Sequence, residues 1–282
     1  MSPLVIRVSD SAGFCWGVER ALEVARRAAA DAPGPVNTLG PLIHNPGVIV
    51  ELQRRGIGMI SSPGEATEGT VILRSHGVPR EMKEQLCAAD LQVLDATCRF
   101  VTSAQEKAAG LRAEGYLVVI LGERDHPEVL ALRSYAGEDS LVAETPADLP
   151  EELPSLRVGM VVQTTQSRER LSELVAYLAP RTRELLVHNT ICNATEQRQT
   201  AATAMAREVD VVIVVGGRNS GNTRRLAELC AVEQPRTYHV ESADEIDPMW
   251  LRDARVVGIT AGASTPADQI ETVVRRLREI GS

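Results

Sequence analysis

Three cysteines share one repeated sequence context that could hold a reactive or metal-binding sulfur. Cys15, Cys98 and Cys192 each follow a strand-like run and directly precede a helical pattern, in GFCWGVERALEVA, DATCRFVTSAQEKAA and TICNATEQRQTAA. The N–H groups and the dipole at a helix start lower the pKa of a thiol and favour the thiolate, the form that binds metals. One such cysteine alone is most simply a buried hydrophobic side chain, so the functional interpretation depends on the repetition.

The repetition extends beyond the cysteines. Each is followed by a strand that ends in glycine, and Gly40, Gly122 and Gly216 lie 25, 24 and 24 residues after their cysteines. A polar side chain stands four residues beyond each glycine, and a second strand in each unit ends in another polar group. These residues are His44, His126 and Ser220 after the glycines, and His76, Thr164 with Thr165, and Ser264 after the second strands. Agreement at two landmarks in all three copies indicates three similar units.

The elements that must position these residues alternate between short apolar strands and helices. Strand-like runs include 116–122 and 209–217, and helical patterns include 101–114 and 194–207. Continuous apolar strands between helices are typical of parallel sheets covered on both faces. We therefore expect an α/β fold of three similar units with mostly parallel sheets, in a pseudo-threefold arrangement whose strand carboxyl ends face a shared centre. The expected units are residues 1–93, 94–186 and 187–282.

Composition excludes several classes of function. The 282 residues carry 30 Lys and Arg against 38 Asp and Glu, and only 3% are aromatic. The net charge of −8 argues against a nucleic-acid or anionic membrane surface, and the scarce aromatics argue against a base-stacking platform. The N-terminus has no signal-peptide pattern, and no apolar run approaches the ~20 residues that span a bilayer. We expect a cytoplasmic protein whose thiols stay reduced, so the five cysteines are not a disulfide framework.

Three thiolates at equivalent positions favour an iron–sulfur cluster over zinc. Structural zinc sites usually show local pairs such as C-x2-C, which this sequence lacks, whereas a cluster can take ligands from distant segments. Three cysteines leave one iron of a cubane open to a substrate oxygen, which indicates catalysis instead of electron transfer alone. Cys87 and Cys230 have no repeat counterparts and are expected to be structural.

Polar residues at expected helix starts suggest an anionic ligand. Asn45 precedes a proline in HNPGV, DHPEV repeats the pattern, and GGRNSGNTRRLAEL supplies Gly, Asn and Ser before a helix. Several helix N-termini directed at one centre bind phosphate without a Walker lysine, although each such residue could also only cap its helix. Three of the five histidines fall at repeat landmarks and are interpreted as functional; His188 and His239 are expected to be structural.

An ordered set of motifs resembles one enzyme family, the 4-hydroxy-3-methylbut-2-enyl diphosphate reductases, which catalyse the last step of the non-mevalonate isoprenoid pathway. The resemblance spans nearly the whole chain. The motifs are GFCWGVERA, GPLIHNP, RSHGVP, DATCRFV, DHPEV, VVQTTQS, TICNATEQRQ, RNSGNTRRLAEL and TAGASTP, in the family's order.

The resemblance implies a trefoil of three α/β units around a [4Fe–4S] cluster held by Cys15, Cys98 and Cys192. The open iron would take the substrate's allylic hydroxyl. Two electrons from an external low-potential donor of the ferredoxin or flavodoxin type, together with protons, would then remove it as water. The products would be isopentenyl and dimethylallyl diphosphates.

Further residues match the family's site. Glu128 matches the proton donor, Thr164 matches the residue that contacts the substrate hydroxyl, and His126 matches a histidine that helps bind substrate and move protons. The residues that match the diphosphate pocket are His44, His76, Ser220, Asn222 and Ser264, with Gly221 contributing a backbone N–H. Gly221 itself departs from the family, which commonly has a second serine there. Trp16 stands for a more usual Phe, and Glu123 stands where a basic residue or His is common.

Three other interpretations compete with this one. A second open-iron enzyme class, the quinolinate synthase type, also has three units and three cysteines, but the motifs here do not resemble it. A non-catalytic iron–sulfur sensor would have no need for Glu128 or Thr164. A metal-free phosphate-binding module would leave the equivalent positions of the three repeat cysteines unexplained.

Overall fold

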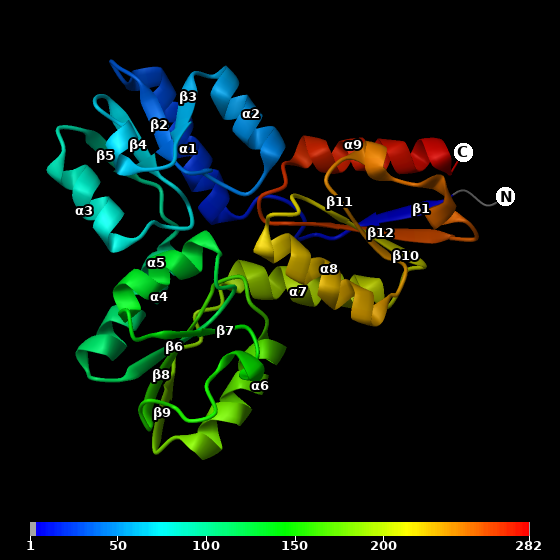
Figure 1. The fold of residues 1–282 in the computed structure, drawn as a ribbon. Helices are drawn as coiled ribbons and strands as arrows, with labels where there is room; N and C mark the ends of the chain where they lie inside the picture. The colour runs from blue at the N-terminus through cyan, green and yellow to red at the C-terminus, as the bar shows by residue number, and fades with distance from the viewer. Residues whose placement is uncertain (1–3, 282) are drawn as a thin grey trace. The chain divides into compact units, whose positions relative to one another are not determined.

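The computed structural model describes residues 4–281, which form three four-stranded sheets whose neighbouring strands are all parallel (Figure 1). The first sheet comprises β2 (Val36–Leu39), β3 (Ile57–Ile60), β4 (Thr70–Leu73) and β5 (Gln92–Asp95). The second comprises β6 (Leu117–Leu121), β7 (Leu141–Ala143), β8 (Arg157–Val162) and β9 (Glu184–Val187). The third comprises β10 (Val211–Val215), β11 (Thr237–Val240), β12 (Val256–Ala261) and β1 (Val5–Val8).

All three sheets have one topology. The strand orders are β3-β2-β4-β5, β7-β6-β8-β9 and β11-β10-β12-β1. In each sheet the strand that precedes a repeat cysteine is an edge strand. In the third sheet this strand is β1, from the start of the chain, so that sheet combines strands from the two ends of the sequence. The threefold repeat and the parallel α/β class predicted from the sequence are confirmed.

α-Helices make most of the connections between strands, while β3 to β4, β7 to β8 and β11 to β12 are joined through short 3-10 helices. The helices in the described residues are α1 (Trp16–Asp31), α2 (Pro46–Arg54), α3 (Arg80–Ala88), α4 (Arg99–Ala113), α5 (Pro127–Ala136), α6 (Arg168–Leu178), α7 (Asn193–Ala206), α8 (Gly221–Glu233) and α9 (Ala267–Ile280). The helices predicted from the 3.6-residue pattern all occur, with ends within three residues of the predicted ones. Along residues 4–281 no helix is long and apolar enough to cross a bilayer.

The fold divides into two compact units. The terminal unit takes the residues up to Val18, His44–Val48 and Asn193 onward, and contains the third sheet. The middle unit takes Glu19–Ile43 and Ile49–Cys192, and contains the first two sheets. The division predicted at residues 93 and 186 falls inside the edge strands β5 and β9, and the three ranges stay a prediction.

The second sheet shows why its central strand is a continuous apolar run. Val118 and Ile120 of β6 face a core that they share with residues of α4 and α5. Val119 and Leu121 face the opposite core, which includes Leu174 of α6. Because successive side chains of a strand point to opposite faces, a strand with helices on both faces must be apolar at every position.

Gly159 of β8 provides a test of this packing. A Cβ at Gly159 would lie 2.6 Å from Cδ2 and 2.8 Å from Cδ1 of Leu111, which is only 2% exposed. Since Leu111 cannot move away from the sheet, Gly159→Ala should lower the free energy of unfolding by about 1–3 kcal/mol. Equilibrium urea unfolding followed by far-UV circular dichroism measures the change.

The matched control for this prediction is Gly110→Ala, one residue before Leu111 on α4. A Cβ there meets nothing within 4 Å, and Gly110 is exposed in the helix. We expect stabilisation by about 0.5–1 kcal/mol, the ordinary gain of Ala over Gly inside a helix. Equal losses in both variants would contradict the packing argument.

Candidate active site

The three repeat cysteines occupy the same local structure in their three sheets. Each is the residue immediately before a helix: Cys15 before α1, Cys98 before α4 and Cys192 before α7. Each also donates its backbone N–H to a carbonyl in the loop that follows the neighbouring strand of its sheet. These bonds run from Cys15 to Ala263 (3.1 Å), from Cys98 to Ser75 (2.9 Å) and from Cys192 to Thr164 (3.1 Å). The predicted strand-to-helix junction is therefore confirmed at all three positions.

The chemistry of these thiols suits an iron–sulfur cluster. All three cysteines are half-buried, none of the five cysteines in the described chain forms a disulfide, and each repeat cysteine stands at a helix start, where its sulfur can serve as a cluster ligand. Cys230 differs because burial raises the pKa of its thiol to about 12. Cys87 lies exposed near the end of α3. Among residues 4–281 no three His, Cys, Asp or Glu side chains gather closely enough to hold a single metal ion.

A buried acid and a hydroxyl meet in the middle unit. Glu128 is 1% exposed in the first turn of α5, and its carboxylate accepts two hydrogen bonds from Thr164, which follows β8. The backbone N–H of Thr164 donates at 2.6 Å and its Oγ1 at 2.8 Å. The carbonyl of the same Thr164 accepts from Cys192. One residue thus links the predicted proton donor to a predicted cluster ligand.

The two histidines of the middle unit extend this group. His126 caps α5, where its Nδ1 accepts the backbone N–H of Glu128 at 3.1 Å. The ring of His76 lies edge-on to that of His126, with centroids 5.6 Å apart. His76 follows Ser75, whose carbonyl holds the N–H of Cys98. The middle unit therefore brings its six predicted site residues into one contiguous group: Cys98, His76, His126, Glu128, Thr164 and Cys192.

Burial controls the protonation of Glu128. Removal from water raises the pKa of its carboxyl from 4.5 to about 7. The two hydrogen bonds from Thr164 act in the opposite direction because they favour the charged form, and the nearby charge of Glu123 adds a smaller increase. A carboxyl with a pKa near 7 can both hold and release a proton at neutral pH, as a general acid must.

Gln163 is a member of this group that sequence analysis did not select. Its side chain is fully buried after β8, its Oε1 accepts the N–H of Glu123 at 2.9 Å, and its Nε2 donates to Thr165 at 3.0 Å. A Cβ on Gly122 would lie 2.8 Å from Gln163 Oε1. The amide therefore fixes the loop before His126 to the loop that carries Thr164.

The terminal unit contains most of the residues predicted to bind a diphosphate, whereas His76 belongs to the middle unit. Ser264, in the loop after β12, donates from Oγ to the carbonyl of His44 at 3.0 Å. A Cβ on Gly217 would lie 2.9 Å from the same carbonyl. The N–H of Ser220 donates to the Gly217 carbonyl at 3.0 Å, and its Oγ caps α8 by accepting from Thr223. Cys15 joins this group through its bond to Ala263, the neighbour of Ser264.

Asn222 supplies a donor that the protein leaves unused. Asn222 lies in the first turn of α8 and is 5% exposed, and its buried Nδ2 has no hydrogen-bond partner among the described residues. A buried amide without a partner costs free energy, so a ligand or an ordered water is expected to complete it. Gly221 is also buried at the first residue of α8, where its N–H has no partner within the helix.

Arg198 is a second residue that sequence analysis passed over, although it lies inside the motif TICNATEQRQ. It is 4% exposed in α7, and its Nη2 donates to the carbonyl of Gly13 at 2.8 Å. Gly13 has φ of +108°, a conformation that favours glycine. Arg198 therefore holds the turn that presents Cys15. Trp16, the residue after Cys15, is 51% exposed.

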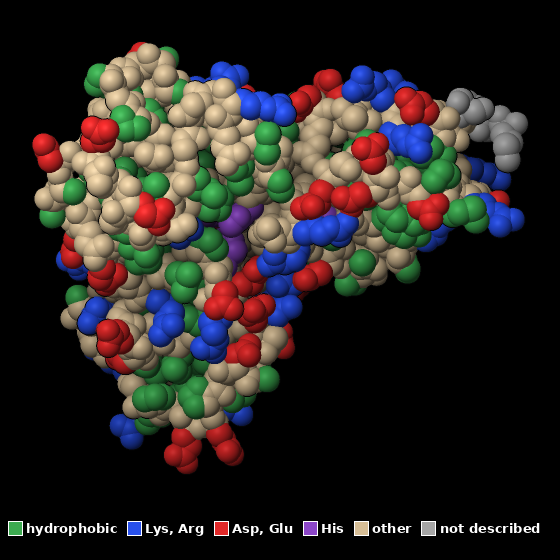
Figure 2. Space-filling model, turned by 45° about the horizontal axis from the view of Figure 1, so that its top comes forward, with side chains coloured by type: hydrophobic (Ala, Val, Ile, Leu, Met, Phe, Trp, Pro, Cys, Tyr) green, Lys and Arg blue, Asp and Glu red, His purple; other side chains and the backbone are tan. Residues whose placement is uncertain are grey.

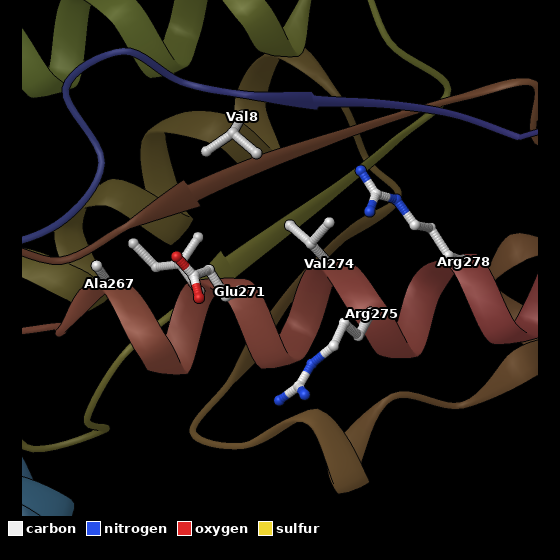
Figure 3. A pocket seen from close by; sticks show the side chains of 7 residues that line it. Val8, Ala267, Glu271, Val274, Arg275 and Arg278 are labelled. Carbon is white, nitrogen blue, oxygen red and sulfur yellow. The ribbon is translucent and has the colours of Figure 1, made fainter.

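A groove beside α9 does not add to this site. This groove, of about 410 Å³, lies along β1 and α9 (Figure 3). It is lined by apolar side chains and by Glu271, Arg275 and Arg278, and none of the predicted site residues lines it. Figure 2 shows basic and acidic side chains interspersed on one face of the molecule.

These features define a class of protein: a parallel α/β fold of three equivalent sheets, with thiols at helix starts and a buried carboxylic acid hydrogen-bonded to a hydroxyl. The family model described as LytB protein matches residues 6–278. The chain belongs to the LytB protein family.

Curated relatives and solved structures agree with this family. The chain is 47% identical over 280 residues to 4-hydroxy-3-methylbut-2-enyl diphosphate reductase of Geobacter metallireducens, covering 98% of each chain. It is 46% identical over 280 residues to the enzyme of that name from Aquifex aeolicus, covering 98% of this chain and 96% of the relative. A solved structure of (E)-4-hydroxy-3-methyl-but-2-enyl diphosphate reductase, the terminal enzyme of the non-mevalonate pathway, is 45% identical. It matches with a TM-score of 0.71 over 98% of this chain and 100% of that chain. A Plasmodium falciparum reductase structure, 24% identical, shares the fold with a TM-score of 0.90 over 97% of this chain and 87% of that one.

The raised pKa of Glu128 predicts a pH-dependent stability. Between pH 4.5 and about 7 the folded protein keeps a proton on Glu128 that the unfolded chain has released. The free energy of unfolding therefore falls as pH rises through this window, by up to about 3 kcal/mol, and levels off above it. Glu128→Gln should lack this decline. Urea unfolding of both proteins from pH 5 to 8 measures the difference, and parallel curves would show that Glu128 titrates normally.

Proposed function

We propose that the chain reduces 4-hydroxy-3-methylbut-2-enyl diphosphate to isopentenyl and dimethylallyl diphosphates. The reaction breaks the allylic C–O bond, adds two electrons and two protons, forms one C–H bond and releases water. The observation that carries this proposal is the buried Glu128–Thr164 pair beside Cys192. The relatives that share the whole length of the chain are named for this activity.

The acid and the hydroxyl have distinct parts in the proposed reaction. Thr164 Oγ1 holds the substrate hydroxyl near the carboxyl of Glu128. Glu128, protonated near neutral pH because of its burial, gives its proton to the departing oxygen, which leaves as water. His126 fixes the start of α5 and with it Glu128, and in this proposal it also helps to bind substrate and move protons. Because Glu128 is buried, its carboxyl is shielded from bulk water, and in this proposal its proton passes to the bound substrate and not to solvent.

A [4Fe–4S] cluster completes the proposed site, with Cys15, Cys98 and Cys192 as its ligands. When bound, the cluster would supply the two electrons and an iron that polarises the substrate hydroxyl. The helix starts and the repeated carbonyl bonds support this assignment, because they fix the backbone of each cysteine in the same way. The electrons would come from an external low-potential donor of the ferredoxin or flavodoxin type, in the cytoplasm.

The diphosphate would be held by neutral donors in place of a cationic pocket. The buried Nδ2 of Asn222, the hydroxyls of Ser220 and Ser264, and the N–H of Gly221 supply hydrogen bonds at a helix N-terminus. The imidazoles of His44 and His76 complete the proposed set. A serine in place of Gly221 would add a hydroxyl but is not required for the backbone contact.

The deciding experiment is anaerobic purification followed by iron and sulfide analysis. We expect a brown protein with about four iron and four sulfide per chain, the content of one cubane, that reduces the hydroxylated allylic diphosphate with a reduced low-potential dye. Cys98→Ser should lose the cluster, whereas Cys87→Ser, a thiol on the exposed part of α3, should keep it. Colourless wild-type protein after reconstitution would overturn the cluster. An intact cluster without turnover would favour the sensor interpretation.

Glu128→Gln tests the proton donor separately. The Gln amide can accept the N–H of Thr164 and donate to its Oγ1, so substrate affinity should change by no more than about twofold. Turnover should fall about 10²–10⁴-fold, the usual contribution of a positioned acid. Steady-state kinetics and substrate binding by calorimetry measure the two effects, with the exposed Glu138→Gln as control. Unchanged turnover would remove Glu128 from the mechanism.

A further inference from the structure

One side chain of the terminal unit connects both sides of the proposed diphosphate site. Gln269 lies in the first turn of α9. Its Oε1 accepts a hydrogen bond from Nδ2 of Asn45 at 3.0 Å, and its Nε2 donates to the backbone carbonyl of Glu241. Sequence analysis did not select Gln269, since it follows the last recognised motif.

The direction of these bonds is fixed by the groups at their ends. The carbonyl of Glu241 can only accept, so Gln269 must present its NH2 group there and its oxygen to Asn45. Asn45 must then donate from Nδ2, which leaves its Oδ1 to accept the N–H of Val48 at 3.2 Å, as the cap of α2. Asn45 is 2% exposed, so solvent does not offer an alternative partner.

On one side, the bridge reaches the loop that precedes α8. Glu241 accepts the backbone N–H of Arg218 at 2.6 Å through its carboxylate, while its carbonyl receives Gln269. His239, two residues earlier, bonds from Nε2 to the carbonyl of Gly216 at 2.8 Å. These contacts support the loop from Gly216 to Ser220 on the β11 side.

On the other side, the bridge reaches the turn that carries His44. Asn45 follows His44 directly, and the His44 carbonyl receives Ser264 and lies against Gly217. A shift of Asn45 would therefore move His44 relative to Ser264 and to the loop that ends at Ser220. Gln269 sets the spacing between the two segments.

We propose that Gln269, acting through Asn45 and Glu241, is a positioning residue that preorganises the terminal-unit segments for a diphosphate group. This inference rests on the proposed function, because it takes the ligand to be a diphosphate. Binding then requires no rearrangement of these segments, so the bridge contributes to affinity and leaves the bond-breaking step unaffected. Gln269 itself touches neither substrate nor the reacting atoms.

The test compares variants that break the bridge from its two ends. Gln269→Leu removes both hydrogen bonds at similar volume. Asn45→Asp keeps the acceptor that caps α2 but loses the donor to Gln269. In the cluster-loaded enzyme each should raise KM for the allylic diphosphate and Kd for inorganic pyrophosphate about 3–10-fold, the usual effect of losing one or two hydrogen bonds, with kcat within about twofold. The control is Gln85→Leu on the exposed face of α3, which should change nothing.

The double variant separates a shared bridge from two independent effects. If Asn45 and Gln269 act through one contact, their effects should not add. The Kd of the double variant for pyrophosphate should then be at most about twofold above the higher of the two single-variant Kd values. Should Gln269→Leu fail to fold, Asn45→Asp still tests the proposal, because it should raise KM and leave kcat within about twofold. If wild type binds pyrophosphate and both single variants bind it with the same affinity, the positioning role of Gln269 is overturned. The proposed function would not be affected by that result. Wild-type enzyme that neither binds pyrophosphate nor turns over the allylic diphosphate would overturn the proposed function, and the inference with it.

Discussion

The hydrogen bond between each repeat cysteine and the loop after the neighbouring strand organises the whole site. A parallel edge strand ends beside its neighbour, so the residues that follow both strands meet at the same edge of the sheet. The cysteine N–H joins them, to Ala263, Ser75 or Thr164. Each of these loop residues is, or directly precedes, a residue predicted to contact substrate. The same backbone contact thus sets a sulfur and a substrate-binding group side by side three times.

The second constraint is the burial of Glu128. Desolvation raises the pKa of its carboxyl, while the bonds from Thr164 lower it, and the balance leaves the group near neutrality. A more exposed carboxyl would be ionised and unable to donate a proton, and one without Thr164 would hold its proton too tightly to exchange it readily. The hydroxyl of Thr164, proposed to contact the substrate, therefore also tunes the pKa of the proposed proton donor. Glu123, unusual at its position, shifts the same balance slightly toward the protonated form.

The sequence was sufficient for the parts that depend on local pattern. Buried strands such as β6 and β10 are continuous apolar runs, and helix starts at Cys98 and Ser220 follow from turn and capping residues. The short strands β3 and β7 were not predicted, and β11 was indicated only by the strand-like run around His239. Each lies at the outer edge of its sheet and has three or four residues, too few to show a period. The pairing of β1 with β12 could not be predicted because it joins residues from opposite ends of the chain.

The site residues also divide into those that the sequence could identify and those that only the folded structure identifies. Cysteines and histidines stand out by type and by repeated spacing, so sequence could select them. Gln163, Arg198 and Gln269 have common side chains, and their importance lies in partners 40, 185 and 224 residues away. Such contacts exist only once the sheets are formed.

The two compact units also divide the proposed chemistry. The buried acid, its hydroxyl partner and two of the three cysteines belong to the middle unit, whereas the unpartnered amide of Asn222 and most of the proposed phosphate donors belong to the terminal unit. Proton transfer needs a dry carboxyl, and phosphate recognition needs many convergent donors, so the two tasks favour different surroundings. An acidic protein could meet the second need with the proposed amide, hydroxyl and backbone donors, which would bind an anion without concentrating positive charge. Arg218, in the loop before α8, is paired with Glu245. Recognition in this chain is therefore attributed to oriented N–H and O–H groups, whose positions depend on packing and on bridges such as Gln269.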